Sequence, residues 1–425
     1  MNRIALQQCL RARAVPRLPR STALFQRSFA TTETSTEQEK RHVAFDDGLS
    51  PALETILTEA QNKIILPSYI PPQTRKRIFD PKYAPTLKNN PVFIEIDDIH
   101  HRFSATPLST IPRTKKTLRK AVTAMETPRD FDQFNRLLAG FTHAGDKPDP
   151  AVLAALSRVL AGKGQLGVLL EAARQVKRTG FQVGSPAVVH TLLTWGQVKA
   201  LDAGWARAET EKALKWSRHI LEMSALDAHK FVHKRRPVLP SPLHRDPIAL
   251  TAPLHLAAAL AVGHEGGLDL DKQVSLYARQ LVHVWPQDKG YKELYPEEAL
   301  QTLTRLGGVD YVRSARTMYT TMSLALHGLK LASQVVEPEL AKHLDAIASR
   351  LETDLAADKA SFPNGLEEGS MHKRVSGELF DANGAIKFDV KPEAAEVAPA
   401  AEEAEKAGEA EQGNNRGRVP RSHVK

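Results

Sequence analysis

The apolar residues between positions 131 and 226 recur every three or four positions, which is the spacing of amphipathic helices. One such series contains Val152, Leu153, Leu156, Val159 and Leu160. The glycines that follow successive series are Gly145, Gly162, Gly164 and Gly180. Glycine commonly ends helices because it adopts left-handed backbone angles at little cost. The pattern therefore predicts a succession of helices joined by tight turns.

The helical pattern also repeats over a longer distance. Ala151 and Ala187 open two similar apolar series 36 residues apart, a period typical of helical-hairpin repeats. Comparable series occupy residues 49–65, 248–262, 272–285, 309–331 and 338–355, and another starts at Pro296. Ala and Leu dominate the apolar residues, which favours helix over strand. We expect an all-α fold whose body of helical hairpins spans residues 121–361.

Residues 150–184 resemble one pentatricopeptide repeat, with a turn at Lys163 and Gly164 and a closing Arg-Thr-Gly-Phe at residues 178–181. Residues 134–138 and 143–145 are similar to the opening half of another such repeat. The resemblance implies a scaffold of paired helices. Arrays of these repeats read one RNA base per repeat through polar side chains near the fifth and last positions. Those positions here hold Ala154 and Gly184, which offer no base-specific hydrogen bond, so sequence-coded reading of RNA is not expected.

The first 29 residues have the composition of a mitochondrial transit peptide. They contain six arginines and no acidic residue, together with many Ala, Leu and Ser residues. We place the cleavage after Phe29, and the alternative is a disordered basic tail. The chain's one cysteine, Cys9, lies in this leader, so disulfides and cysteine zinc sites are not expected in the processed protein. Residues 30–62 then form a polar N-terminus and one short helix, with Ser50 as its N-cap and Pro51 at its first position.

Residues 63–120 combine proline with positive charge. The segment has twelve Lys and Arg residues against four Asp and Glu residues, a net charge of +8. Its prolines argue against a continuous helix, and residues 92–96 could form one short strand. A basic, extended arm with aromatic residues among its charges suits an RNA surface, because cations release counterions from phosphates and aromatic rings stack on bases. The alternative is a solvated linker.

Eleven cations are the candidate RNA-binding residues. Eight lie in the basic arm and three in a predicted loop after residue 228. They are Arg75, Lys76, Arg77, Lys82, Lys115, Lys116, Arg119, Lys120, Lys234, Arg235 and Arg236.

Residues 362–425 are expected to be a disordered tail. Between residues 389 and 411 the chain has eight acidic residues against two lysines and is rich in Ala and Pro. Such a segment buries too little apolar area to offset the entropy lost on ordering.

Several chemistries find little support in the sequence. Gly162, Gly164 and Gly167 match G-x-G-x-x-G, but a predicted helix precedes them where a dinucleotide site needs a strand, so a helix-turn-helix corner explains them better. His229 and His233 are four residues apart, yet lysines and an arginine surround them and no further ligand completes a metal site. No apolar run approaches the ~18–20 residues of a membrane-spanning helix. We therefore expect no enzyme, cofactor, metal, small-molecule substrate or membrane insertion.

A basic leader, a helical body, a basic arm and an acidic tail together resemble the mitochondria-specific proteins of the fungal mitochondrial ribosome. The pentatricopeptide-like stretch favours the small subunit. The resemblance implies a structural role in the mitochondrial matrix, with mitochondrial rRNA and neighbouring ribosomal proteins as partners. Two alternatives stay open: a free matrix RNA-binding factor for transcript stability or translation, and an assembly factor for a respiratory complex.

Overall fold

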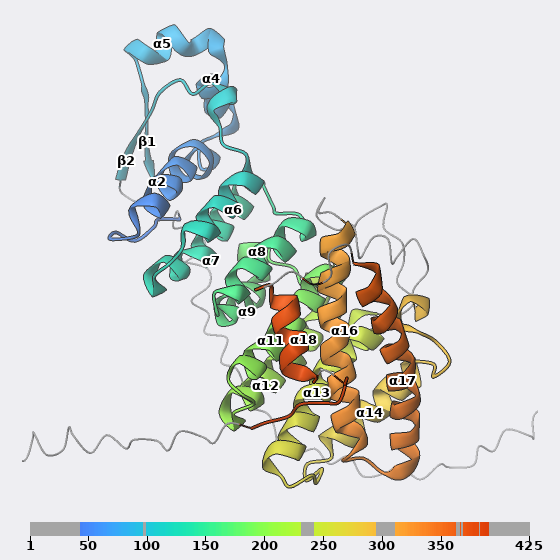
Figure 1. Cartoon of the computed structure of the whole chain (residues 1–425). Coiled ribbons are helices and arrows are strands. Elements are labelled where there is room, and N and C mark those ends of the chain that lie inside the picture. Colours follow the sequence, from blue (N-terminus) through green and yellow to red (C-terminus); the bar gives the residue numbers. More distant parts are fainter. Residues whose placement is uncertain are drawn as a thin grey trace, which may run out of the picture. The chain divides into compact units, whose positions relative to one another are not determined.

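The computed structural model describes residues 43–96, 99–230, 242–294, 311–362, 366, 369–381 and 383–390, with residues 311–315 described by their backbone alone. The predicted leader, the loop cations Lys234, Arg235 and Arg236, the helix expected from Pro296 and the acidic part of the tail lie outside these residues. The described part is helical apart from one β-hairpin and two isolated bridges, which confirms the all-α expectation (Figure 1).

The basic arm is made of short elements. Three of its helices, α3 (Leu66–Ser68), α4 (Pro72–Phe79) and α5 (Ala84–Asn89), begin at a proline or carry one in the first turn, because proline has the right φ and lacks an N–H that would have no partner there. α3 nevertheless continues without a break from α2 (Pro51–Ala60), which precedes the arm, through a π-helical stretch (Gln61–Ile65). The arm also contains β1 (Val92–Ile96), β2 (Ile99–Phe103) and the start of α6 (Thr114–Ala124).

The strand expected at residues 92–96 is present and pairs with a second strand that the sequence did not indicate. β1 and β2 are antiparallel, with Val92 opposite Phe103 and Ile96 opposite Ile99. Alternate residues of the hairpin pack with α3 and α4 around a small core of their own, which we call the hairpin core. Its buried residues are Leu66, Ile70, Ile78, Ile96 and Phe103.

The first half of the body follows the predicted helices. Gly145, Gly164 and Gly180 all have positive φ at the ends of helices, as their positions predicted. The paired helices confirm helical hairpins, whereas the pentatricopeptide type of repeat stays a prediction. The helices are α7 (Pro128–His143), α8 (Pro150–Gly162), α9 (Leu166–Arg174), α10 (Val176–Thr179), α11 (Pro186–Asp202) and α12 (Arg207–Ala225).

α7 begins at a buried carboxylate that also holds the start of α2. Asp130 is fully buried, and its carboxylate accepts hydrogen bonds from the Ser50 hydroxyl at 2.6 Å and from the backbone N–H groups of Ser50, Glu126 and Thr127. Burial alone would raise the pKa of Asp130, but these hydrogen bonds outweigh it and hold the pKa well below its usual range. Ser50 is the N-cap of α2 as expected, yet its hydroxyl donates to Asp130 and makes no capping hydrogen bond to α2.

The second half packs around one apolar helix. Residues of α13 are buried on every side, where the helix meets α12, α14 and α16, and α16 also packs on α17 and α18 (Figure 1). The expectation that no run reaches membrane-spanning length is wrong for α13, which is long and apolar enough but is 83% buried in the body. The helices are α13 (Pro247–His264), α14 (Gln273–Val284), α16 (Tyr311–Ser333), α17 (Pro338–Ser361) and α18 (Met371–Leu379).

The folded chain continues past residue 362, where the tail was expected to begin. Val375 and Leu379 of α18 are fully buried in the large apolar core of the helical body, which we call the main core, and Phe380 forms a β-bridge with Ile386. This segment contributes apolar residues at helical spacing before the Ala/Glu-rich region begins. The folded body therefore includes residues up to 390, and the rest of the expected tail lies outside the described residues.

Two buried histidines connect α13, α16 and this C-terminal segment. His255 Nε2 lies 2.9 Å from His327 Nδ1, and His327 Nε2 donates to the Lys387 carbonyl at 3.0 Å. Burial lowers the pKa of His327 to about 4, against the opposing effect of the Lys387 hydrogen bond. Burial, with a further contribution from His327, also lowers the pKa of His255. Both side chains are therefore neutral at physiological pH.

Candidate nucleic-acid interface

α6 presents four of the predicted RNA-binding cations on one exposed face. Lys115, Lys116, Arg119 and Lys120 form two i, i+4 rows, so they lie side by side on the helix surface. The opposite face is buried in the main core and consists of Thr117, Leu118, Ala121 and Val122. The alternation of paired cations with apolar residues thus gives an amphipathic helix whose solvent side carries four cations and no acidic residue.

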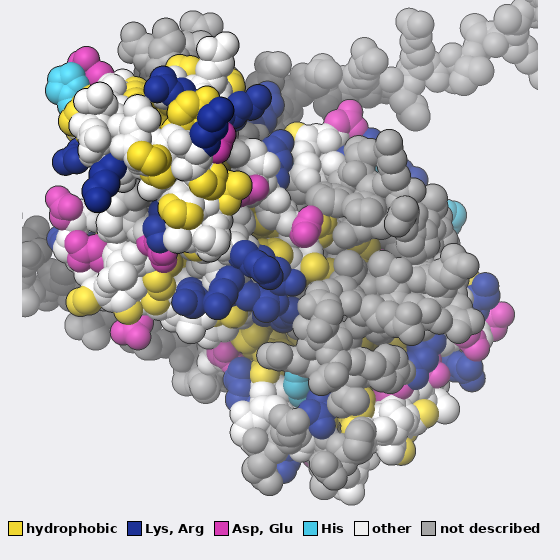
Figure 2. Space-filling model, turned by 90° about the horizontal axis from the view of Figure 1, so that it is seen from above, with side chains coloured by type: hydrophobic (Ala, Val, Ile, Leu, Met, Phe, Trp, Pro, Cys, Tyr) yellow, Lys and Arg dark blue, Asp and Glu magenta, His cyan; other side chains and the backbone are white. Residues whose placement is uncertain are grey.

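The charges of this face are not neutralised within the described residues. None of its four cations has an Asp or Glu within ion-pair distance there, whereas many lysines and arginines on the body helices do. Figure 2 shows a patch of Lys and Arg side chains with few acidic side chains beside it. A concentration of cations without acids attracts phosphate groups and gains free energy from the counterions it displaces.

Lys163 fixes the C-terminal end of α6. Its ammonium donates to the carbonyls of Val122, Thr123 and Met125 at 3.2, 2.7 and 2.6 Å. These carbonyls have no partner within α6, and a cation at a helix C-terminus also interacts favourably with the helix dipole. The glycine-lysine-glycine turn between α8 and α9 is thus a helix corner, as expected, and its lysine anchors the neighbouring basic helix.

The remaining cations of the arm lie on other elements. Lys76 and Arg77 are exposed on α4, Arg75 is half-buried there, and Lys82 is exposed in the turn that follows. The Arg77 guanidinium carbon is 5.6 Å and the Lys82 Nζ 6.0 Å from the centroid of the Tyr83 ring, within range of a cation–π interaction. The structure therefore brings Lys115, Lys116, Arg119 and Lys120 together on one helix, and Arg77 and Lys82 together around Tyr83.

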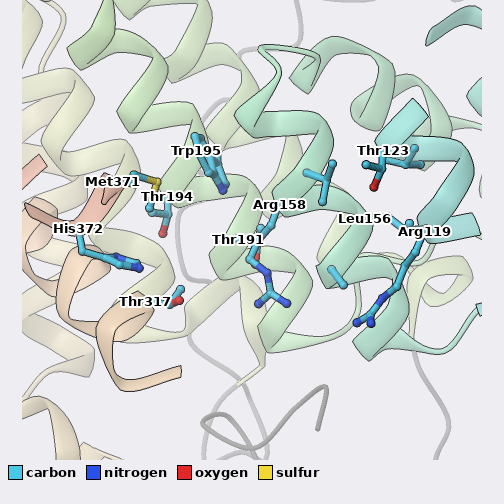
Figure 3. A pocket seen from close by; sticks show the side chains of 13 residues that line it. Arg119, Thr123, Leu156, Arg158, Thr191, Thr194, Trp195, Thr317, Met371 and His372 are labelled. Atoms are coloured by element: carbon cyan, nitrogen blue, oxygen red, sulfur yellow. The ribbon is translucent and has the colours of Figure 1, made fainter. Parts of the chain in front are cut away.

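A groove that the sequence did not indicate adjoins the basic face. It has a volume of about 420 Å³ and lies between α6, α8, α11, α16 and α18. Figure 3 shows Arg158 of α8 between Arg119 of α6 and His372 of α18, with Trp195 of α11 on the same groove. Arg158 interrupts an otherwise apolar helical series, and that interruption is a signal that could have identified it, whereas Trp195 continues the apolar series of its own helix and gives no such signal.

Two comparisons with known proteins bear on the identity of this chain. The family model described as mitochondrial ribosomal protein mS27 matches residues 27–378. The chain belongs to this family. A relative from Neurospora crassa, named small ribosomal subunit protein mS27, is 32% identical over 353 residues, which is 79% of this chain and 88% of the relative.

The mS27 match covers every element of the candidate interface. α6, the turn at Lys163 and the groove all lie inside residues 27–378. Membership in the mS27 family confirms the resemblance to mitochondrial ribosomal proteins on which the functional hypothesis rested. The family concerned is a structural one, and the chain is a mitochondrial protein by that membership.

Of the two histidines considered for metal binding, His229 and His233, the first has a structural role. His229 is buried, and its Nδ1 accepts a hydrogen bond from the Val183 N–H at 3.4 Å. Burial lowers the pKa of His229. His233 lies outside the described residues. Within the part of the chain that is described, no group of three or more His, Cys, Asp and Glu side chains is arranged to hold a metal ion.

Proposed function

We propose that this chain is a structural component of the small subunit of the mitochondrial ribosome, in the matrix, and that α6 binds mitochondrial rRNA. The observation that carries the proposal is the exposed basic face of α6, whose cations have no acidic partner in the described structure. Family membership and the printed name of the Neurospora crassa relative support the ribosomal and small-subunit assignment.

The contact with rRNA would be made to phosphates and not to base edges. Lysine and arginine on a helix face neutralise phosphates without reading sequence. The positions at which a pentatricopeptide repeat would read a base hold a buried Ala154 and Gly184, whose Cα lies close to the backbone of His229. Neither can reach an RNA base, so the shape of the rRNA and the geometry of its backbone would determine where α6 binds.

The cations around Tyr83 would form a second, smaller RNA contact, and Lys234, Arg235 and Arg236 a third. Neighbouring ribosomal proteins would bind the exposed apolar residues near the hairpin core. Phe93 is 62%, Ile99 52% and Leu108 66% exposed. The basic leader, most of which precedes the family match at residue 27, would direct import and be cleaved after Phe29.

The test combines binding to rRNA fragments with sedimentation of mitochondrial lysates. The variant Lys115→Gln/Lys116→Gln/Lys120→Gln removes three charges from α6. We expect its affinity for a small-subunit rRNA fragment to fall at low salt, with the slope of log K against log salt reduced by about 2–3. The matched control Lys215→Gln/Lys342→Gln/Lys359→Gln removes three exposed lysines from the body helices α12 and α17 and should bind as the wild type does.

In a sucrose gradient the wild type should sediment with the small subunit after magnesium chelation separates the two subunits. Sedimentation at the top of the gradient would contradict the proposal and favour a free RNA-binding or assembly factor. If the two triple variants bind the rRNA fragment with equal affinity, α6 does not contribute to the rRNA contact.

A further inference from the structure

The groove beside α6 combines cations, a flat aromatic wall and hydroxyl groups. Arg119 belongs both to the basic face and to the groove, and Arg158 lies between it and α18 (Figure 3). Trp195 is half-buried, and its indole N–H has no hydrogen-bond partner among the described residues. No Asp or Glu is among the described residues that line the groove.

We propose that this groove binds one unpaired nucleotide of a single-stranded RNA segment, with its base against Trp195 and its phosphate between Arg119 and Arg158. Aromatic side chains stack on every base, so such a site accepts a nucleotide without selecting its sequence. The two guanidinium groups provide the planar, bidentate donors that phosphate oxygens accept. The hydroxyl of Thr123, which is exposed, lies within the same lining.

The dimensions of the groove and its position favour RNA over a protein segment. A volume of about 420 Å³ is near the lower end of small-ligand pockets, which suits one nucleotide better than a helix of a partner protein. Because Arg119 is shared with the basic face, an RNA strand whose phosphates follow α6 reaches the groove with its next nucleotide. The inference rests on the proposed function, since it requires α6 to lie against RNA.

The experiment compares two tryptophan variants of the full mature chain. The probe is a fluorescently labelled 12-nucleotide single-stranded uridine RNA, with an RNA duplex of the same length as the second probe. Trp195→Leu should weaken binding of the single strand about tenfold and leave binding of the duplex unchanged, because a duplex keeps its bases stacked internally. The matched control is Trp216→Leu, which removes another half-buried tryptophan, one that lies outside the groove beside Lys199 and Lys212.

Arg158→Gln gives an independent measurement that does not depend on the packing of a large ring. We expect it to lower the salt slope for the single strand by about 0.7, the value for one phosphate contact. A 4-thiouridine in the same single strand should crosslink to the peptide that contains Trp195. Thermal unfolding of each variant confirms that the body remains folded.

Equal affinities of Trp195→Leu and Trp216→Leu for the single strand, or crosslinks confined to other peptides, would overturn the nucleotide site. In that case the α6 triple variant would still test the proposed function, since it weakens single-strand and duplex binding alike. An acidic peptide could also be added as a competitor. If it displaces the single-stranded RNA and crosslinks at Trp195, the inference is overturned and the occupant of the groove is a protein segment.

Discussion

The helical body and the hairpin module of residues 66–106 bury their side chains in different ways. The body has one continuous core in which polar groups such as Asp130, His255 and His327 are buried with specific hydrogen-bond partners. The hairpin core has only five buried residues, and Phe93 and Ile99 of its two strands are exposed. A two-stranded hairpin is marginally stable in water unless other surfaces support it.

This difference suggests how the two regions depend on a partner. In the body, the buried polar groups Asp130, His255 and His327 have hydrogen-bond partners within the chain, and these bonds connect its helices. The hairpin module has a small core and would gain stability from a neighbour that covers Phe93 and Ile99. Three predictions test this contrast, beginning with the change that should affect the body most.

Asp130→Ala should lower the free energy of unfolding by roughly 3–5 kcal/mol. The substitution leaves the Ser50 hydroxyl and three backbone N–H groups without their acceptor and releases α2 from α7. Urea denaturation followed by circular dichroism measures the change. Asp132→Ala is the matched control on the same helix, where the side chain is exposed, and should cost less than about 0.5 kcal/mol. Similar losses for the two variants would contradict the role given to Asp130.

The stability of the body should fall by about 3 kcal/mol between pH 6.5 and pH 4 because of His327. In the unfolded chain this side chain has its ordinary pKa of 6.5, whereas burial lowers the pKa to about 4 in the folded protein. The unfolded state therefore binds more protons within this window, so the free energy of unfolding decreases as the pH falls and is constant with respect to His327 above 6.5. Asp130 contributes only below its ordinary pKa of 3.8, outside the window.

Urea titrations at a series of pH values measure this effect. His327→Gln should reduce the dependence by about this amount, although the variant is less stable at neutral pH. A dependence in the same direction should remain, because burial also lowers the pKa values of His255 and His229. His343→Gln removes an exposed histidine from α17 and should leave the dependence unchanged. An unaltered pH dependence in His327→Gln would show that other groups cause it.

Ile78→Ala should open the hairpin module without unfolding the body. Ile78 is buried in the hairpin core, and its carbonyl accepts a hydrogen bond from the Thr106 N–H at 3.0 Å. We expect hydrogen-exchange protection of the hairpin amides to drop at least about tenfold while the amides of α13 and α16 are unaffected. Phe93→Ser, a substitution at an exposed position, should leave the hydrogen-exchange protection of both sets of amides unchanged in the free protein. It should weaken only the association with the ribosome. Loss of protection in α13 would show that the two regions unfold together.

The sequence was most informative where local chemistry decides the structure. Gly164 and Gly180 marked helix ends because a left-handed residue is needed there, and the paired lysines of α6 identified a solvent face. The boundary at residue 362 was misjudged because α18 carries only two fully buried side chains, Val375 and Leu379, which give a weak periodic signal.

The groove could not be predicted because it depends on long-range packing. Arg119, Arg158, Trp195 and His372 come from four helices that are far apart in the chain. Nothing in the local pattern around Arg158 indicates that a tryptophan 37 positions later will face the same groove. In the same way, β2 has no apolar alternation of its own that would identify it, since its central residues are His100, His101 and Arg102.

The three-carbonyl contact of Lys163 has a mechanical consequence. A single ammonium held at three points resists both rotation of α6 about its axis and sliding along it. A load applied to α6 would therefore be transmitted through the turn to α8 and α9, in addition to the load carried by its buried face. Chemical removal of that one charge, for example by acetylation of Lys163, would weaken this support while leaving the buried face packed and all four cations of the outer face in place.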